Sequence, residues 1–223
     1  SGHMGFYLIG GIAFLASMLV QWRLKSAYAL WGKVRNSRNL TGAEVAAQIL
    51  RSNGIHDVKV EPIAGTLTDH YDPRSKRVRL SEGNFAGTSV AALGVAAHEV
   101  GHAMQDAQGY APMKIRAGLV PVANLGTSMG PYLAIGGMML GMTGMVTLGL
   151  VLFAGAVLFQ FVTLPVEFDA SRRAITQLDS LGIVDPKEKA GATRVLKAAG
   201  LTYVAAAATS FTDLLYFILA SRD

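Results

Sequence analysis

The sequence predicts a mostly helical α+β protein that combines a polar domain containing a small β-sheet with about three to four transmembrane helices. Charged residues make up only 16% of its 223 residues, against roughly 25% in a typical soluble domain. The deficit is local, because residues 117–166 contain no charged side chain whereas residues 23–116 hold 13 of the 20 Lys and Arg residues. Alternating apolar and polar residues within the charged segment predict strands between its helices.

The N-terminal apolar segment is predicted to be a retained membrane anchor. Residues 5–22 are uncharged, and at about 1.5 Å per residue they just span the roughly 30 Å hydrocarbon core. Arg23 and Lys25 follow the run, whereas a signal peptide carries positive charge before its apolar run and a small-residue cleavage site after it. Residues 1–4 are expected to be a remnant of a cleaved expression tag.

The polar segment 23–116 is predicted to fold as a domain of helices and short strands. Thr41 and Glu44 have the spacing of a capping box, in which the Thr hydroxyl and the Glu carboxylate satisfy each other's backbone amides. The expected elements are a helix from 41 to 54, strands at 58–60 and 76–80 with a turn at 69–74 between them, and a helix from Thr88 or Ser89 to about Ala107.

The charge-free run of 50 residues at 117–166 has room for two membrane helices of about 20 residues each. Glycine and threonine gather near its middle, so we expect helices over 117–139 and 145–165 joined by a tight turn. A single apolar core of a soluble domain is the alternative, but it would need polar residues wherever the run met water. Residues 167–200 are polar again. Residues 201–220 are predicted to be a fourth membrane helix, a helix at the interface or a helix packed on the others.

Composition excludes several kinds of site. The chain has no cysteine, which excludes disulfides, iron–sulfur ligation, a thiol nucleophile and any zinc site that uses thiolate. A net charge of +5 is compatible with a nucleic acid partner or with a basic membrane-adjacent face. Because the basic residues flank the apolar runs, the sequence favours the membrane and predicts no nucleic acid partner.

Residues 95–104 read V-A-A-H-E-V-G-H-A-M. On a helix, residues i and i+4 share a face, so His98 and His102 can bind one metal ion. Glu99 lies beside that pair, where it can take a proton from a metal-bound water. One buried histidine is usually a satisfied core residue, but two histidines and a glutamate would be costly in an apolar helix without a partner. Imidazole ligands and this spacing favour Zn²⁺ as the cofactor.

A catalytic zinc site needs a third protein ligand and keeps one position for water. Asp106, one turn beyond His102, is expected to support a ligand, because three ligands on one straight helix cannot surround an ion. Glu167 and Asp169 appear where the charge-free run ends, and Glu167 is favoured, although it could instead mark the membrane edge. Pro165 is expected to break or start a helix just before them. The candidates for the third ligand are therefore His56, His70, Glu167 and Asp169.

The topology must return Glu167 to the side that carries His98 and His102, which requires an even number of crossings within 117–166. Lys and Arg residues gather on that side: five follow the first helix, two precede the charge-free run and seven lie after residue 166. The positive-inside rule therefore predicts a multi-pass protein whose catalytic domain faces the cytoplasm.

Five stretches of the chain carry a likeness to a known family: Lys33–Arg38, Leu40–Ala46, Leu67–Arg74, Val95–Tyr110 and Leu164–Ala174. They resemble the YugP family of membrane-bound neutral zinc metallopeptidases, nearly end to end. The resemblance implies a zincin-like metallopeptidase domain, a Zn²⁺ cofactor, a protein or peptide substrate and a location in a prokaryotic cell membrane.

A more distant resemblance links the chain to the HtpX type of membrane peptidase. In that group the ligand glutamate opens an E-x-x-A-D pattern, and the matching residues here begin at Glu167. Ser171 stands where the aspartate would be, so the groups that support the metal ligands must differ. Asp169 is expected to supply that support.

The zincin resemblance also implies an edge strand near the zinc helix that receives the substrate backbone. Lys76–Leu80 is the expected strand. His70 and Tyr71 would then donate hydrogen bonds to the developing oxyanion. A polar turn without a catalytic role explains the same two residues equally well.

The predicted function is a membrane-bound zinc endopeptidase in which Glu99 assists the attack of a zinc-bound water on a peptide bond. An intramembrane protease is one alternative, but it would place a ligand aspartate in a later membrane segment, and residues 117–166 contain none. A non-catalytic metal-binding membrane protein is the other, and it would not need Glu99 as a base. The expected partners are the lipid bilayer and a protein or peptide substrate, whereas the oligomeric state is not predicted.

Overall fold

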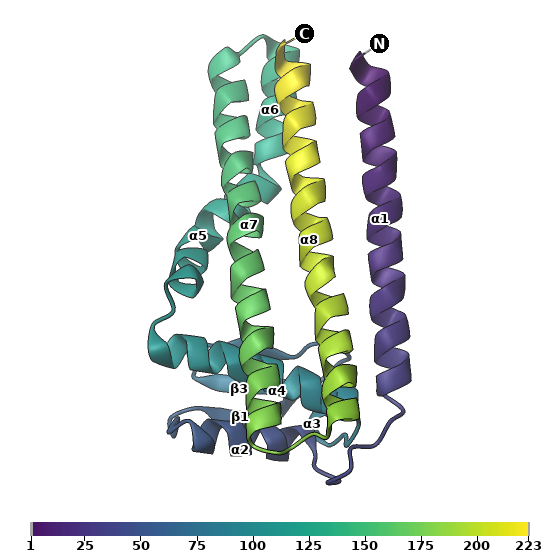
Figure 1. Cartoon of the computed structure of the whole chain (residues 1–223). Coiled ribbons are helices and arrows are strands. Elements are labelled where there is room, and N and C mark those ends of the chain that lie inside the picture. Colours follow the sequence, from purple (N-terminus) through teal and green to yellow (C-terminus); the bar gives the residue numbers. More distant parts are fainter. Residues whose placement is uncertain (1, 223) are drawn as a thin grey trace. The chain divides into compact units, whose positions relative to one another are not determined.

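The computed structural model describes residues 2–222, so Ser1 of the expected tag remnant lies outside the described residues. The chain divides into two compact units. We call Ser1–Gln21, Ala111–Pro165 and Leu201–Asp223 the apolar unit, and Trp22–Tyr110 with Val166–Gly200 the polar unit. The elements, all but β2 labelled in Figure 1, are α1 (Gly2–Trp31), α2 (Gly42–Ser52), β1 (Lys59–Ile63), β2 (His70–Asp72), β3 (Arg77–Ser81), α3 (Glu82–Phe85), α4 (Val90–Gln108), α5 (Ala111–Ser128), α6 (Gly130–Leu140), α7 (Thr143–Ser180) and α8 (Pro186–Arg222).

The polar unit contains a three-stranded sheet in the order β1-β3-β2. β1 pairs with β3 in parallel, and β2 pairs with β3 antiparallel. The turn predicted over 69–74 is therefore wrong for His70–Asp72, because Tyr71 pairs with Val78 and its side chain is buried. The prediction that Lys76–Leu80 is an edge strand is also wrong, since β3 has a hydrogen-bonded neighbour on each side.

Helices α2 and α4 pack on each other, and α4 also contacts β2 and β3. The predicted capping box is confirmed: the Thr41 hydroxyl accepts from the Glu44 amide, and the Glu44 carboxylate accepts from the Thr41 amide. Ser89, rather than Thr88, caps α4 by accepting from the amide of Ala92. The core between these elements contains fully buried side chains at Val45, Ile49, Val78, Leu80 and Leu93.

In the apolar unit, the continuous helix predicted over 117–139 is wrong. The chain forms α5 and α6 with a break at Met129, because Pro131 lacks the amide that would continue α5 and instead occupies the first turn of α6. Helix α6 lies against α7 at a very short separation. A Cβ atom added at Gly149 would lie 2.5 Å from the amide nitrogen of Ala134, so only glycine permits this approach.

Helix α7 continues through Pro165, so the expected helix break at that proline is wrong. Proline removes one backbone hydrogen bond, and a long apolar helix can tolerate that loss when packing holds the residues around it. Val166, directly after the proline, is fully buried in the polar unit. Three described helices, Met4–Trp31, Thr143–Ser180 and Pro186–Arg222, are long and apolar enough to cross a membrane, and α6 is a shorter apolar helix.

Candidate metal centre

Helix α4 and the polar-unit part of α7 touch backbone to backbone at the centre of the site. A Cβ atom added at Gly101 would lie 2.4 Å from the carbonyl oxygen of Ala170. The glycine of the H-E-V-G-H motif is therefore needed for the close approach of the two helices. Ala170 lies between Glu167 and Ser171 on α7, so this approach presents both of their side chains to α4.

Three potential ligand atoms converge at this crossing. The Nε2 atom of His98 lies 2.9 Å from Oε2 of Glu167, and Nε2 of His102 lies 3.2 Å from the same oxygen. Zinc ligands at about 2.0–2.1 Å in a tetrahedral arrangement lie roughly 3.3 Å from one another, so these separations fit a zinc ion. Of the described residues, these three form a group that could hold a metal, and its ligand atoms all lie within 4.8 Å of one another.

A buried glutamine fixes the orientation of one imidazole. Gln105 is fully buried, and its side-chain nitrogen donates to the carbonyl oxygen of Val166 and to Oδ2 of Asp169, both at 2.9 Å. Because both partners are acceptors, Oε1 of Gln105 must face Nδ1 of His102, 2.9 Å away. Nδ1 then carries the proton, and the lone pair of Nε2 points toward Glu167.

A second polar contact orients the other imidazole. Nδ1 of His98 lies 2.9 Å from Oγ of Ser171, so the serine that replaces the aspartate of the HtpX pattern still meets a ligand candidate. Asp169 does not join the three-residue group directly. It contacts Arg172 and accepts from Nε of Arg173 at 2.6 Å, and it reaches the imidazoles only through Gln105.

Glu99 lies next to His98 on the helix that carries both histidines. It follows His98 on α4 and lies three residues before His102, and its side chain is buried with only 8% of the residue exposed. The electrostatic interactions of such a buried carboxylate are screened less than they would be in bulk water.

The structure places Asp106 in a different contact from the one the sequence suggested. Its carboxylate accepts from the Tyr71 hydroxyl at 2.5 Å and from Nζ of Lys76 at 3.0 Å, which ties β2 and the following turn to α4. Burial, together with the hydrogen bond to Asp106, raises the pKa of Tyr71, so the phenol stays neutral. The same carboxylate raises the pKa of Lys76.

His70 and His56 are not brought to the three-residue group. His70 pairs with Arg79 in the sheet register, so it lies on the face opposite to the Tyr71 side chain. Its Nδ1 lies 2.9 Å from the carbonyl oxygen of Thr68. His56 is exposed in the loop before β1. The sheet geometry therefore separates the predicted His70–Tyr71 pair.

Sequence reasoning missed Gln105, although a weak signal existed. A glutamine three residues after a histidine lies about one helical turn away on the same face, so Gln105 could have been proposed as a partner of His102. Its other partners, Val166 and Asp169, lie more than 60 positions later in the chain and cannot be assigned from α4 alone.

Comparison with known proteins agrees with this centre. Residues 6–222 match the model of a family described as "Putative neutral zinc metallopeptidase". The chain is 47% identical over 209 residues to "Putative membrane protease YugP" of Bacillus subtilis (strain 168), a match that covers 94% of this chain and 91% of that relative. No solved structure matches the chain, so its zincin-like fold stays a prediction. The family match and this identity, which span nearly the whole chain, show that the protein belongs to this family of neutral zinc metallopeptidases.

Proposed function

We propose that the protein is a membrane-bound zinc endopeptidase whose site combines α4 with the part of α7 that follows the apolar run. The observation that carries this proposal is the convergence of His98, His102 and Glu167 beside the buried Glu99. Two imidazoles and one carboxylate are a common ligand set of zinc hydrolases. Because a purely structural zinc site has no use for an adjacent base, Glu99 favours a hydrolase over a storage or scaffold site.

Each residue of the site has a distinct task in this proposal. His98, His102 and Glu167 would hold a Zn²⁺ ion, which when bound would polarise the scissile carbonyl and acidify water. Glu99 takes a proton from the attacking water and returns it to the leaving amine, so that neither the hydroxide nor the amine anion has to form freely. Gln105 and Ser171 hold the two imidazoles with Nε2 directed at the ion.

We place the site on the cytoplasmic face of a multi-pass protein in a prokaryotic cell membrane. The polar unit holds both Glu167 and the α4 histidines, as a chain that returns to its starting side would require. Except for Lys114, Arg116 and Arg222, the basic residues that flank the apolar runs also lie in this unit. The positive-inside rule places such residues in the cytoplasm. Protein or peptide segments that reach this face are the proposed substrates.

Replacing Glu99 with glutamine tests the proposal. The Glu99→Gln variant should retain zinc at the wild-type stoichiometry, because the three ligands remain. Its cleavage of an unfolded model protein should fall by about 10²–10⁴-fold, the usual contribution of a general base. Glu82→Gln, an exposed carboxylate on α3, is the matched control and should cleave normally. Undiminished cleavage by Glu99→Gln would show that the mechanism is wrong.

A further inference from the structure

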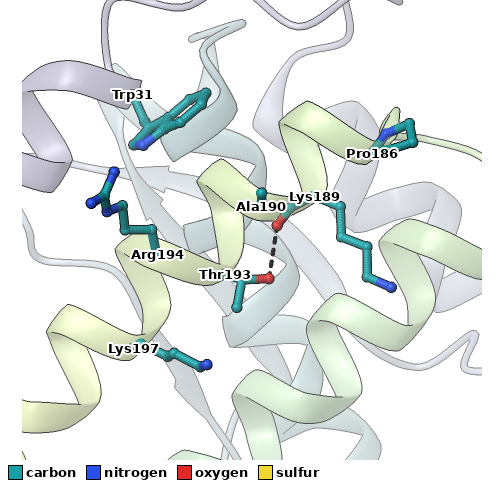
Figure 2. Close-up of a pocket in the computed structure, with 7 residues that line it drawn as sticks. All are labelled: Trp31, Pro186, Lys189, Ala190, Thr193, Arg194 and Lys197. Carbon is teal, nitrogen blue, oxygen red and sulfur yellow. Dashed lines mark hydrogen bonds between the residues drawn. The ribbon is translucent and has the colours of Figure 1, made fainter.

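The polar unit contains a groove that the peptidase site does not use. It has a volume of about 550 Å³ and lies between the end of α1 and the first turns of α8 (Figure 2). One wall is the indole ring of Trp31, which lies against the backbone of α8: a Cβ atom added at Gly191 would be 2.4 Å from the ring. The remaining lining comes from α8, at Pro186, Lys189, Ala190, Thr193, Arg194 and Lys197.

The polar groups of this groove are almost all donors. Trp31 is about nine-tenths buried, and its indole N–H has no hydrogen-bond partner among the described residues. The side chains of Arg194 and Lys197 are exposed, and neither has a hydrogen-bond acceptor among the described residues. Lys189 pairs with Asp179 at 3.0 Å, and the Thr193 hydroxyl donates to the Lys189 carbonyl. With three cations and no acid in its lining, the groove lacks an anionic acceptor.

The position of the groove along α8 indicates where that acceptor comes from. Lys197 precedes the apolar segment that begins at Leu201 by four residues, which is about 6 Å of helix rise. Arg194 precedes it by about 10 Å. The headgroup layer of a bilayer adds roughly 5–8 Å beyond each side of the hydrocarbon core. If residues 201–220 enter the bilayer, both cations lie at or just beyond headgroup level, where long basic side chains reach phosphate groups.

We propose that this groove binds the phosphate-bearing headgroup of an anionic phospholipid. The phosphate would accept from Arg194 and Lys197, and the Trp31 N–H would gain the acceptor that it lacks. Trp31 is the last residue of α1, and its side chain combines an apolar ring with one polar N–H, as the binding of a lipid headgroup beside apolar surface requires. The proposal depends on the membrane placement of α1 and α8 and is independent of the zinc chemistry.

The test uses the full chain in nanodiscs of a zwitterionic phosphatidylcholine, with and without phosphatidylglycerol. In a Trp22→Phe background, Trp31 is the sole tryptophan, so its fluorescence reports on the groove. Phosphatidylglycerol should change this signal saturably and raise the melting temperature. The Arg194→Gln/Lys197→Gln variant should weaken the apparent affinity about tenfold or more, since each basic contact near an anionic surface contributes about 1 kcal/mol.

The control variant, Arg51→Gln/Lys187→Gln, removes two exposed charges from the same unit outside the groove and should change the affinity less than about twofold. Trp31→Phe keeps an aromatic ring but removes the N–H together with the five-membered ring, so the lipid-dependent rise in melting temperature should be weaker when it is measured from the variant's own melting temperature in phosphatidylcholine alone. Equal losses in both charge variants, or no response of the wild type, would overturn the proposal. A full response to inorganic phosphate alone, with no added effect of the lipid, would overturn the lipid assignment.

Discussion

The two units of the chain are stabilised in opposite ways. The polar unit buries its large apolar side chains: Ile49, Leu80 and Val100 are fully buried. The apolar unit leaves many such side chains exposed, including Phe14, Tyr132 and Met139, of which 65%, 76% and 81% of the surface is accessible. A soluble protein rarely exposes apolar surface on this scale. The apolar unit therefore has the surface expected of helices that are long and apolar enough to cross a membrane, whereas the polar unit has its own core.

The units also differ in what their glycines do. In both, a glycine lets two helices approach backbone to backbone, but Gly101 brings α4 to the metal-site part of α7, whereas Gly149 brings α6 to the apolar part of α7. Helices in lipid associate through such small-residue contacts, since burial of apolar surface gives them little advantage there. Substitutions at these two glycines and in the hydrogen bonds around the metal site should therefore have separable effects.

Gly101→Ala should damage the polar unit most. Its Cβ atom would press on the Ala170 carbonyl and push α4 away from α7, which should cost about 3 kcal/mol or more in the free energy of unfolding and abolish zinc binding. Melting temperature and zinc content together measure this. Gly94→Ala on the same helix is the control, because its Cβ would meet Ala192 at an ordinary 3.6 Å. Normal zinc content in Gly101→Ala would contradict the close approach.

Gly149→Ala should act on the apolar unit alone. Its Cβ atom would clash with backbone atoms of Ala134 and Gly130, and overpacking of this kind costs about 2–3 kcal/mol. Thermal unfolding in nanodiscs should show the loss, while Gly144→Ala, which meets nothing within 4 Å, should be neutral. Zinc content should remain unchanged. If zinc were lost, the metal site would depend on the packing of the apolar unit.

Gln105→Leu should weaken the metal site without breaking the fold of the polar unit. In this variant Nδ1 of His102 loses its acceptor, the contact that keeps the proton on Nδ1 and leaves the lone pair of Nε2 free for the metal. Loss of such a partner lowers zinc affinity by about 10- to 100-fold. Competition with a zinc chelator measures the dissociation constant. Ser171→Ala removes the corresponding partner of His98 and should have an effect in the same direction. An unchanged zinc affinity in both variants would refute the orienting role of these residues.

The smallest expected effect is a pH dependence of the melting temperature that comes from Glu61 in the sheet of the polar unit. The hydrogen bond from Arg79 lowers the pKa of Glu61 below its ordinary value, with a further contribution from Arg77. A carboxyl whose pKa is lower in the folded state stabilises the fold above its unfolded pKa of about 4.3, and that contribution is lost as the pH falls through the folded pKa. Between pH 6 and pH 3, the melting temperature of Glu61→Gln should therefore fall less than that of the wild type. Glu82→Gln, at an exposed carboxylate of α3, should behave like the wild type.

The parts of the fold that local patterns determine were predictable from the sequence. The capping box at Thr41 and Glu44 depends on four consecutive residues, and the metal-binding helix depends on the spacing of His98 and His102. The break before α6 had a local signal as well, because Gly130-Pro131 is a helix breaker followed by a residue suited to a first turn. The length of the charge-free run points the other way, to a single helix before the turn.

The remaining features depend on contacts between distant residues. Strand β2 contains turn-forming residues, and it is a strand because Tyr71 pairs with Val78 and is buried beside α4. Pro165 predicts a break, yet α7 continues because packing outweighs one lost hydrogen bond. The orientation of Gln105 depends on acceptors more than 60 positions away. No local pattern carries this information.

The most direct test of the account is the zinc stoichiometry of the purified full chain, measured by elemental analysis for the wild type, Glu167→Gln and Asp169→Asn. The account predicts close to one zinc per chain in the wild type, a large loss in Glu167→Gln, and retention with weaker affinity in Asp169→Asn, because Asp169 acts only through Gln105. Full zinc content in Glu167→Gln together with loss in Asp169→Asn, or no zinc in the wild type, would contradict the assignment of the metal centre.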